Sequence, residues 1–222
     1  LTVTPLGIDT DHFKPPSDQI RAQRRRALKI PEEAFVFGYL GRFGAEKNLH
    51  VLVQAFEQLR APNTHLLMVG GDPAVLRSPT HGPGITWVGP TMTPHLYYQA
   101  MDAYVLPSLS ECAPLAIREA MASGVLPLST PVGNVPSYLS EEVGFLFAPN
   151  CVDDLKAQMM RTLSNPSTHA ARKEKARARI VAQGDWAASS AQIRGILSDV
   201  LNEATHTNPS TKGFNSRAPK ES

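Results

Sequence analysis

The chain has few of the residues that could cross-link a fold or hold a metal ion. Only two of its 222 residues are cysteines, Cys112 and Cys151, and their positions have no metal-ligand spacing. Its seven histidines are scattered, with no pair at helical spacing. These features exclude a disulfide scaffold and argue against a cysteine zinc site, so we expect two free thiols.

Charge of one sign and long apolar runs are lacking as well. The 22 basic and 20 acidic residues leave a formal charge of +2, which is too small to indicate nucleic-acid binding. No apolar run is long enough to cross a bilayer and no signal pattern is present, so we expect a cytoplasmic protein.

Basic residues gather at 21–29 and 172–179. A solvated helix face explains both clusters most simply, and the alternative is contact with an anionic membrane surface, as in a peripheral protein.

The chain does contain a regular alternation of short apolar runs and helical patterns. Runs of strand length occur at 34–40, 64–70, 85–89, 103–107, 125–129 and 144–147. Helical patterns occur at 49–59, 94–101, 114–123, 152–164, 167–181 and 186–201. This alternation predicts an α/β fold, a Rossmann-like parallel sheet with helices on both faces. We expect residues 1–202 to form this domain and the polar residues 203–222 to be a disordered tail.

Residues 110–124 carry two carboxylates, eight positions apart, around a predicted helix start. Pro114 suits the first turn of the helix and Gly124 suits its end, which places Glu119 inside the helix and Glu111 just ahead of it. The first N–H groups of this helix have no intrahelical acceptors and can hold a diphosphate. Glu119 can accept hydrogen bonds from both ribose hydroxyls while Glu111 faces a second sugar. On this segment alone, two ordinary surface charges are an equal alternative.

A second motif, at 41–48, lies between the predicted strand 34–40 and the helical pattern that begins at Leu49. Ligands of open parallel sheets bind beyond the carboxyl ends of the strands, which is where this loop lies. Arg42 can fork onto phosphate oxygens and Lys47 can add a point charge. The two cations would offset the charge of a nucleoside diphosphate without a metal, although an arginine and a lysine in a loop are more often plain surface charges.

Five motifs occur in the order found in one known family. They are the Gly41-Arg42 pair with the Glu46-Lys47 pair, followed by the segments 69–73, 107–111, 119–124 and 131–136. In this order they resemble the donor-binding half of retaining glycosyltransferases of family 4, and the resemblance covers roughly residues 1–202. It implies the C-terminal half of the two-domain GT-B architecture, which binds a sugar nucleotide.

The resemblance also implies roles for individual residues. Arg42 and Lys47 would stabilise the leaving diphosphate, and Glu111 would position the donor sugar, so these three form the expected catalytic group. The expected donor-binding residues are Gly41, Arg42, Lys47, Val88, Glu111, Cys112, Ala113, Pro114, Leu115 and Glu119. The donor is a nucleoside diphosphate sugar, and neither a metal nor another cofactor is implied.

The chain differs from the family pattern at the residues after Glu111, where Cys112 and Ala113 replace a common glycine and aromatic pair. Asp9 and Asp11 match a metal-binding string of another glycosyltransferase fold, but their position predicts a turn.

Residues 1–5 have the pattern of a strand entering the second half of such an enzyme, so we expect the N-terminal acceptor-binding domain to be absent and to be supplied in cis or in trans. The acceptor would be a glycan, a lipid or a small molecule. The alternatives are an epimerase or phosphorylase of the same architecture, and a non-catalytic sugar-nucleotide-binding or adaptor module.

Overall fold

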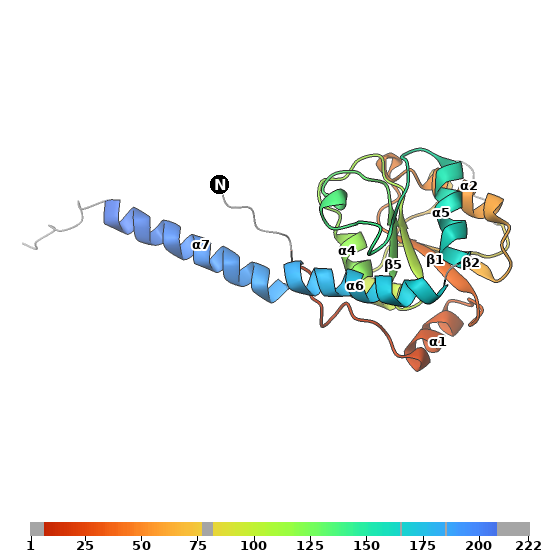
Figure 1. Cartoon of the computed structure of the whole chain (residues 1–222), viewed down its shortest axis with the longest axis horizontal. Coiled ribbons are helices and arrows are strands. Elements are labelled where there is room, and N and C mark those ends of the chain that lie inside the picture. Colours follow the sequence, from red (N-terminus) through yellow and green to blue (C-terminus); the bar gives the residue numbers. More distant parts are fainter. Residues whose placement is uncertain (1–6, 77–81, 165, 185, 208–222) are drawn as a thin grey trace, which may run out of the picture.

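The computed structural model describes residues 7–76, 82–164, 166–184 and 186–207. Six parallel strands form one sheet in the order β3-β2-β1-β4-β5-β6. Figure 1 shows the sheet with helices packed against it. Their bounds are β1 Phe35–Leu40, β2 Thr64–Val69, β3 Ile85–Val88, β4 Ala103–Leu106, β5 Leu126–Ser129 and β6 Phe145–Leu146. Each lies within one residue or two of a predicted apolar run, and the predicted Rossmann-like α/β fold is confirmed.

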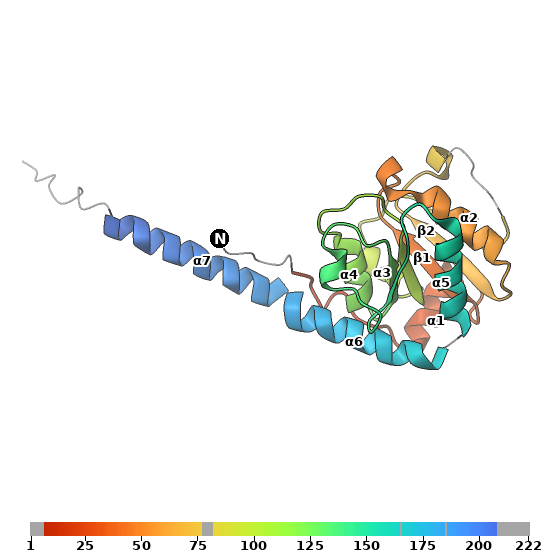
Figure 2. The same cartoon turned by 45° about the horizontal axis from the view of Figure 1, so that its top comes forward.

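The described residues form seven α-helices. They are α1 Asp18–Ala27, α2 Leu49–Leu59, α3 Pro94–Tyr98, α4 Leu115–Ala122, α5 Val152–Ser164, α6 Pro166–Gly184 and α7 Trp186–Thr207. Helix α2 packs against α5, and α4 packs against α6 (Figure 2). Because parallel crossovers are right-handed, these two pairs cover opposite faces of the sheet. The strands between them are buried, as their nearly continuous apolar sequences predict.

The strand order reverses next to β1, whose neighbours are β2 on one side and β4 on the other. The chain leaves β1 toward α2 on one face, whereas it leaves β4 toward α4 on the other. The connections after these two strands therefore diverge and open a crevice at the carboxyl edge of the sheet, where ligands of such folds bind. This topology places residues 41–48 beside residues 107–114.

The arginines of α1 hold the helix to the opposite edge of the sheet. Arg25 is buried, and its guanidinium donates to the main-chain oxygens of Glu32, Ala34 and Ala100 and to the carboxylate of Asp102 at 2.7 Å. The helix begins at Asp18 and has favourable acidic and basic ends. The prediction that this cluster is a solvated face is therefore wrong for Arg25.

Helix α6 uses its basic residues in the same way. Arg177 donates to the main-chain oxygens of Thr10, Phe13 and Ala122, which fastens the N-terminal segment to the end of α4. Burial lowers the pKa of Lys173, one turn before Arg177. The expected solvated face is therefore wrong for Arg177, because its guanidinium donates to several main-chain carbonyls beneath the helix.

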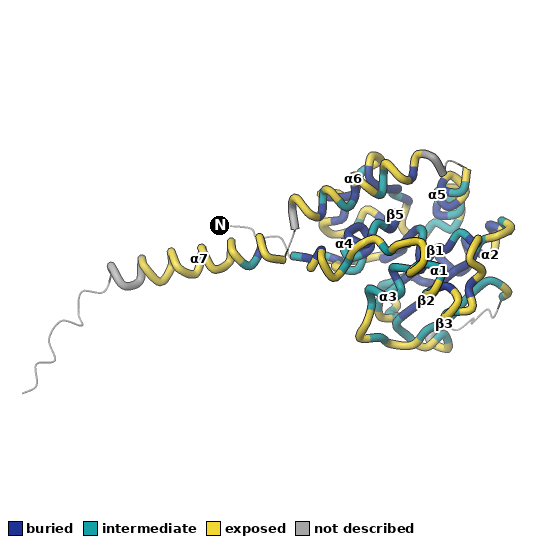
Figure 3. The backbone as a smooth tube through the Cα atoms, turned by 90° about the horizontal axis from the view of Figure 1, so that it is seen from below, coloured by how far each residue is buried: buried dark blue, intermediate teal, exposed yellow. Residues whose placement is uncertain are grey.

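Helix α7 leaves the body of the domain (Figures 1 and 2). It continues to Thr207, so residues 203–207 are helical, and the predicted disordered tail is wrong there. Most of the side chains described on α7 are exposed, as the yellow tube in Figure 3 shows. The rest of the expected tail and the expected strand at 1–5 lie outside the described residues. Among the helices that the structure describes, none combines the length and hydropathy needed to cross a membrane.

Candidate functional site

The loop after β1 passes very close to the end of β2. Gly70 has a φ of +118°, and a Cβ at this position would collide with the main-chain oxygen of Gly41. Only glycine fits this approach, because both the backbone conformation and the space exclude a side chain. The amide of Gly41 donates to the oxygen of Val69 at 3.0 Å, which fixes the start of the loop.

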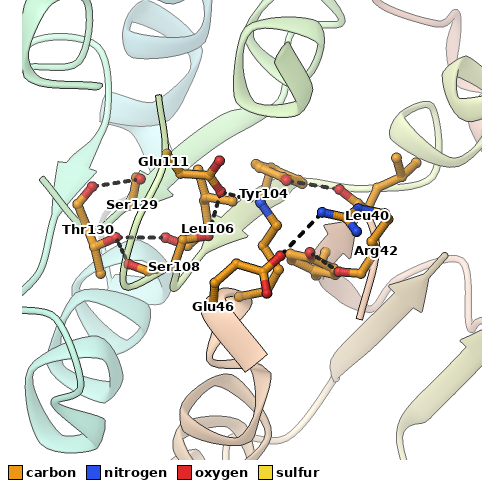
Figure 4. A network of polar contacts seen from close by, with 11 residues as sticks. Leu40, Arg42, Glu46, Tyr104, Leu106, Ser108, Glu111, Ser129 and Thr130 are labelled. Carbon is orange, nitrogen blue, oxygen red and sulfur yellow. Dashed lines mark hydrogen bonds and ion pairs between the residues drawn. The ribbon is translucent and has the colours of Figure 1, made fainter. Parts of the chain in front are cut away.

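Lys47 ends a single turn of 3-10 helix, Ala45–Lys47, and points to the connection after β4. Its Nζ lies 2.7 Å from Oε1 of Glu111, and the two side chains are only 17% and 10% exposed. The hydroxyl of Ser108 donates to the same oxygen at 2.7 Å, and Thr130 in turn donates to the Ser108 carbonyl at 2.6 Å (Figure 4). The structure thus brings together Lys47 and Glu111, which lie 64 positions apart and which the sequence motifs predicted to share one site.

Arg42 lies on the solvent side of the same loop. Its side chain is 86% exposed and meets Glu46 at 3.4 Å, which is long for a charge-assisted hydrogen bond. An exposed pair of this kind contributes little to stability, so the arginine can reorient toward a ligand. Both cations of the site are therefore already paired with glutamates. The prediction that they alone offset a diphosphate is incomplete, because the four side chains together carry no net charge.

The N-terminus of α4 faces this loop. The helix begins at Leu115, and Pro114 at its N-cap lacks an N–H group and makes no side-chain capping bond. The first amides of α4 are consequently available to an anion, with the helix dipole favouring negative charge. Pro114 was expected inside the first turn and lies one position before it.

A cleft of about 260 Å³ joins these parts. It is lined by Tyr39, Leu40, Gly41, Arg42, Lys47, Tyr104, Leu106, Glu111, Pro114, Leu115 and Ala116. Six of the ten predicted donor-binding residues line it, contributed by the ends of β1 and β4 and the start of α4. Cations, a carboxylate and the start of a helix thus converge on one hollow at the carboxyl edge of the sheet.

Glu119 lies one turn further along α4 than this cleft. Its Oε2 accepts a hydrogen bond from the hydroxyl of Tyr98 at 3.0 Å. Burial raises the pKa of Glu119, and the Tyr98 hydrogen bond and the charge of His12 lower it in part. A half-buried carboxylate with a second oxygen left over can accept hydroxyl donors.

The remaining predicted residues flank the cleft. Cys112 is an exposed free cysteine, and its main-chain oxygen accepts from the amide of Asn134 at 3.0 Å. Gly133, with a φ of +56°, packs its backbone against Glu111 and Cys112, where a side chain would collide. Ala113 is half-buried beside them. Val88 ends β3, and its carbonyl already accepts from Gly70 at 3.0 Å.

Sequence reasoning missed three tyrosines and a serine. Tyr39, Tyr98, Tyr104 and Ser108 are buried and donate hydrogen bonds to groups of the site. The tyrosines fit the apolar patterns of their elements, so nothing but their hydroxyls distinguished them from core residues. For Ser108, its place three positions before Glu111 was the available signal.

The Asp9 and Asp11 motif forms a turn. Asp9 accepts from the amides of Asp11 and His12 at 3.1 and 2.9 Å, which confirms the predicted turn. In the part of the chain that the structure describes, no group of three or more histidine, cysteine or acidic side chains could hold a metal ion.

The chain is similar in sequence and in fold to known proteins. The model of the family described as glycosyl transferases group 1 matches residues 20–179. The sulfoquinovosyl transferase SQD2 of Arabidopsis thaliana is 28% identical over 210 residues, covering 85% of this chain and 38% of the relative. A solved sucrose-phosphate synthase of Thermosynechococcus elongatus is 26% identical with a TM-score of 0.80, covering 91% of this chain and 53% of the other.

The solved HepE of Anabaena, in complex with UDP, has the same fold with a TM-score of 0.82 at 21% identity, over 89% of this chain and 57% of the other. This chain therefore spans about half the length of the solved proteins and less of the Arabidopsis relative. The matched residues contain both cations, both glutamates and the whole sheet. The chain belongs to the glycosyl transferases group 1 family, and its fold is that of the C-terminal half of a GT-B glycosyltransferase.

Proposed function

We propose that this chain is the donor-binding part of a retaining, metal-independent family 4 glycosyltransferase. The longer enzyme transfers a sugar from a nucleoside diphosphate sugar to an acceptor hydroxyl. The observation that carries the proposal is the cleft in which Arg42, Lys47, Glu111 and the free amides of α4 converge. Binding of UDP by HepE, a protein of the same fold, supports a nucleotide as the ligand.

The roles follow from the chemistry of each group. The α4 amides, Lys47 and a reoriented Arg42 stabilise negative charge as it develops on the leaving diphosphate, where preorganised donors act most strongly. Lys47 has three N–H donors and one is used by Glu111, so two remain for phosphate oxygens. Attack from the face of the leaving group, with the leaving phosphate as base, gives retention without a protein nucleophile.

The two glutamates hold the two sugars of the donor. Glu111, fixed by Ser108 and Lys47, presents its second oxygen to the donor sugar. Glu119 accepts from the ribose hydroxyls, and backbone groups near Val88 contact the nucleobase. Cys112 and Ala113 border the space for the donor sugar, and their small size shapes it. No cofactor besides the donor takes part.

The acceptor is a glycan, a lipid or a small molecule, and an acceptor-binding domain supplied in cis or in trans completes the site. The exposed face of α7 supports such a partner. Large apolar side chains that a solvated helix does not need are exposed there, namely Trp186, Ile193, Leu197, Val200 and Leu201.

Calorimetric titration of the chain with UDP, GDP and ADP tests the proposal. We expect one nucleotide to bind selectively and Glu119→Gln to weaken it by roughly 10-fold or more, since a hydrogen bond to a charged group is lost. Glu57→Gln is the matched control, because Glu57 is exposed at the far end of α2. Absence of binding to all three would favour an adaptor module, and unchanged binding by Glu119→Gln would remove the ribose role.

A further inference from the structure

Three buried tyrosines form a cluster beneath the cleft. Tyr39, Tyr98 and Tyr104 are each no more than 1% exposed. The rings of Tyr39 and Tyr104 are stacked with centroids 6.3 Å apart, and Tyr98 meets Tyr104 edge-on at 5.9 Å. They come from β1, α3 and β4, so the cluster connects three elements that are separate in the sequence.

Two of the hydroxyls hold the loop that carries Arg42. Tyr104 donates to the main-chain oxygen of Leu40 at 3.0 Å, where β1 ends, and Tyr39 donates to that of Arg42 at 2.8 Å. These two oxygens belong to the residues on either side of Gly41, which has no side chain of its own to restrict its backbone. The two bonds therefore fix the direction in which the loop leaves the sheet. Figure 4 shows Tyr104 with Leu40 and Arg42 in this arrangement.

The third hydroxyl holds the other end of the site. The hydroxyl of Tyr98 lies 3.0 Å from each of two acceptors on α4, the main-chain oxygen of Ala116 and a carboxylate oxygen of Glu119, and its proton can be donated to either. Burial raises the pKa of all three tyrosines, so their hydroxyls stay protonated and remain donors at any physiological pH. Phenylalanine would fill the same space without these bonds.

A fourth tyrosine shows that packing alone does not require such bonds. Tyr138 is 6% exposed, and its buried hydroxyl has no hydrogen-bond partner within the described part of the chain. Three tyrosines thus donate hydrogen bonds to groups of the site, whereas the Tyr138 hydroxyl makes no hydrogen bond to a described residue.

We propose that Tyr39, Tyr98 and Tyr104 are positioning residues of the donor site, with Tyr39 and Tyr104 holding the diphosphate end and Tyr98 holding the ribose end. The inference rests on the proposed function, because the bound nucleotide defines these two ends. It extends that function by naming the groups that keep the cleft in its binding shape before a ligand arrives.

The first test uses phenylalanine variants and UDP affinity measured by calorimetry. We expect Tyr39→Phe, Tyr98→Phe and Tyr104→Phe each to weaken UDP by about 3- to 10-fold, the value of one buried hydrogen bond, and Tyr138→Phe to leave it unchanged. In a Glu119→Gln background the effect of Tyr98→Phe should largely vanish, while those of Tyr39→Phe and Tyr104→Phe persist. Equal losses in all four variants, or no losses, would overturn the proposal.

The second test needs no ligand and separates this inference from the proposed function. Amide hydrogen exchange of the free chain should quicken at 41–47 in Tyr39→Phe and Tyr104→Phe, and at 115–119 in Tyr98→Phe, relative to Tyr138→Phe. If no nucleotide binds the wild-type chain, the proposed function fails, yet this exchange pattern still supports the positioning role. Exchange that matches Tyr138→Phe at both segments would refute it.

Discussion

At the scale of single residues, the proposed ribose-binding role of Glu119 makes nucleotide affinity depend on the ionisation of this carboxyl. Burial raises the pKa of this carboxyl above its ordinary value of 4.5. Because only the ionised form accepts from both ribose hydroxyls, affinity for UDP is full above the raised pKa and falls as the pH drops through it. We expect the ratio of wild-type to Glu119→Gln affinity to decline as the pH is lowered from neutrality through the raised pKa of this carboxyl.

The phosphates of UDP also titrate, but this affects binding to the wild-type chain and to the Glu119→Gln variant alike. The ratio of the two affinities therefore isolates the contribution of Glu119. A ratio that stays constant over this range would mean that Glu119 does not bind ribose as a carboxylate.

Some residues of the site were predictable and others were not, for a physical reason. Lys47 and Glu111 lie in the loops that follow strands and Glu119 lies within a helix, all at positions that local patterns reveal. The contact between Lys47 and Glu111 depends on two strands becoming neighbours, which no local pattern determines. The hydroxyls of Tyr39 and Tyr104 are less predictable still, because the same apolar pattern accepts tyrosine and phenylalanine alike.

At the scale of elements, the six strands were predictable because a strand buried on both faces is a continuous apolar run. The role of α1 was not, since its pattern of arginines is that of a solvated helix. Which arginine faces the protein depends on the carbonyls and the carboxylate of Asp102 that β1 and β4 present at their beginnings. The chain thus uses charged side chains where an apolar helix face would be expected.

This arrangement predicts a large difference between two adjacent arginines of α1. Arg25→Ala should lower the free energy of unfolding by about 3 kcal/mol, because it removes the buried guanidinium that pairs with Asp102 and donates to three main-chain carbonyls. Arg26→Ala is the matched control and should change it by less than about 0.5 kcal/mol, since its pair with Glu32 is exposed. Urea unfolding followed by circular dichroism measures both, and equal effects would contradict a structural role for Arg25.

At the scale of the whole molecule, the chain consists of a compact sheet domain and a helix that extends from it. Trp186, at the start of α7, donates its amide to the oxygen of Ile8, so the helix departs beside the segment that leads into the domain. Beyond this point the apolar residues recur at helical spacing, at 193, 197 and 200, yet they remain exposed. A sequence pattern correctly predicts such a helix and its apolar face, but it does not say whether the same chain covers that face.

Because the apolar face of α7 is exposed, we expect substitutions on this helix and in the core of the domain to affect the free energy of unfolding differently. Replacing Ile193 and Leu197 together by glutamate should change the free energy of unfolding of this chain by less than about 0.5 kcal/mol, because the two residues remain 48% and 57% exposed in the folded chain. Leu155→Glu on α5 is the contrasting control, since it places a charge in the core and should prevent stable folding. Urea unfolding measures both. A loss above about 1 kcal/mol in the α7 variant would mean that the helix packs against the domain, and would remove the support that its free face gives to an acceptor-binding partner.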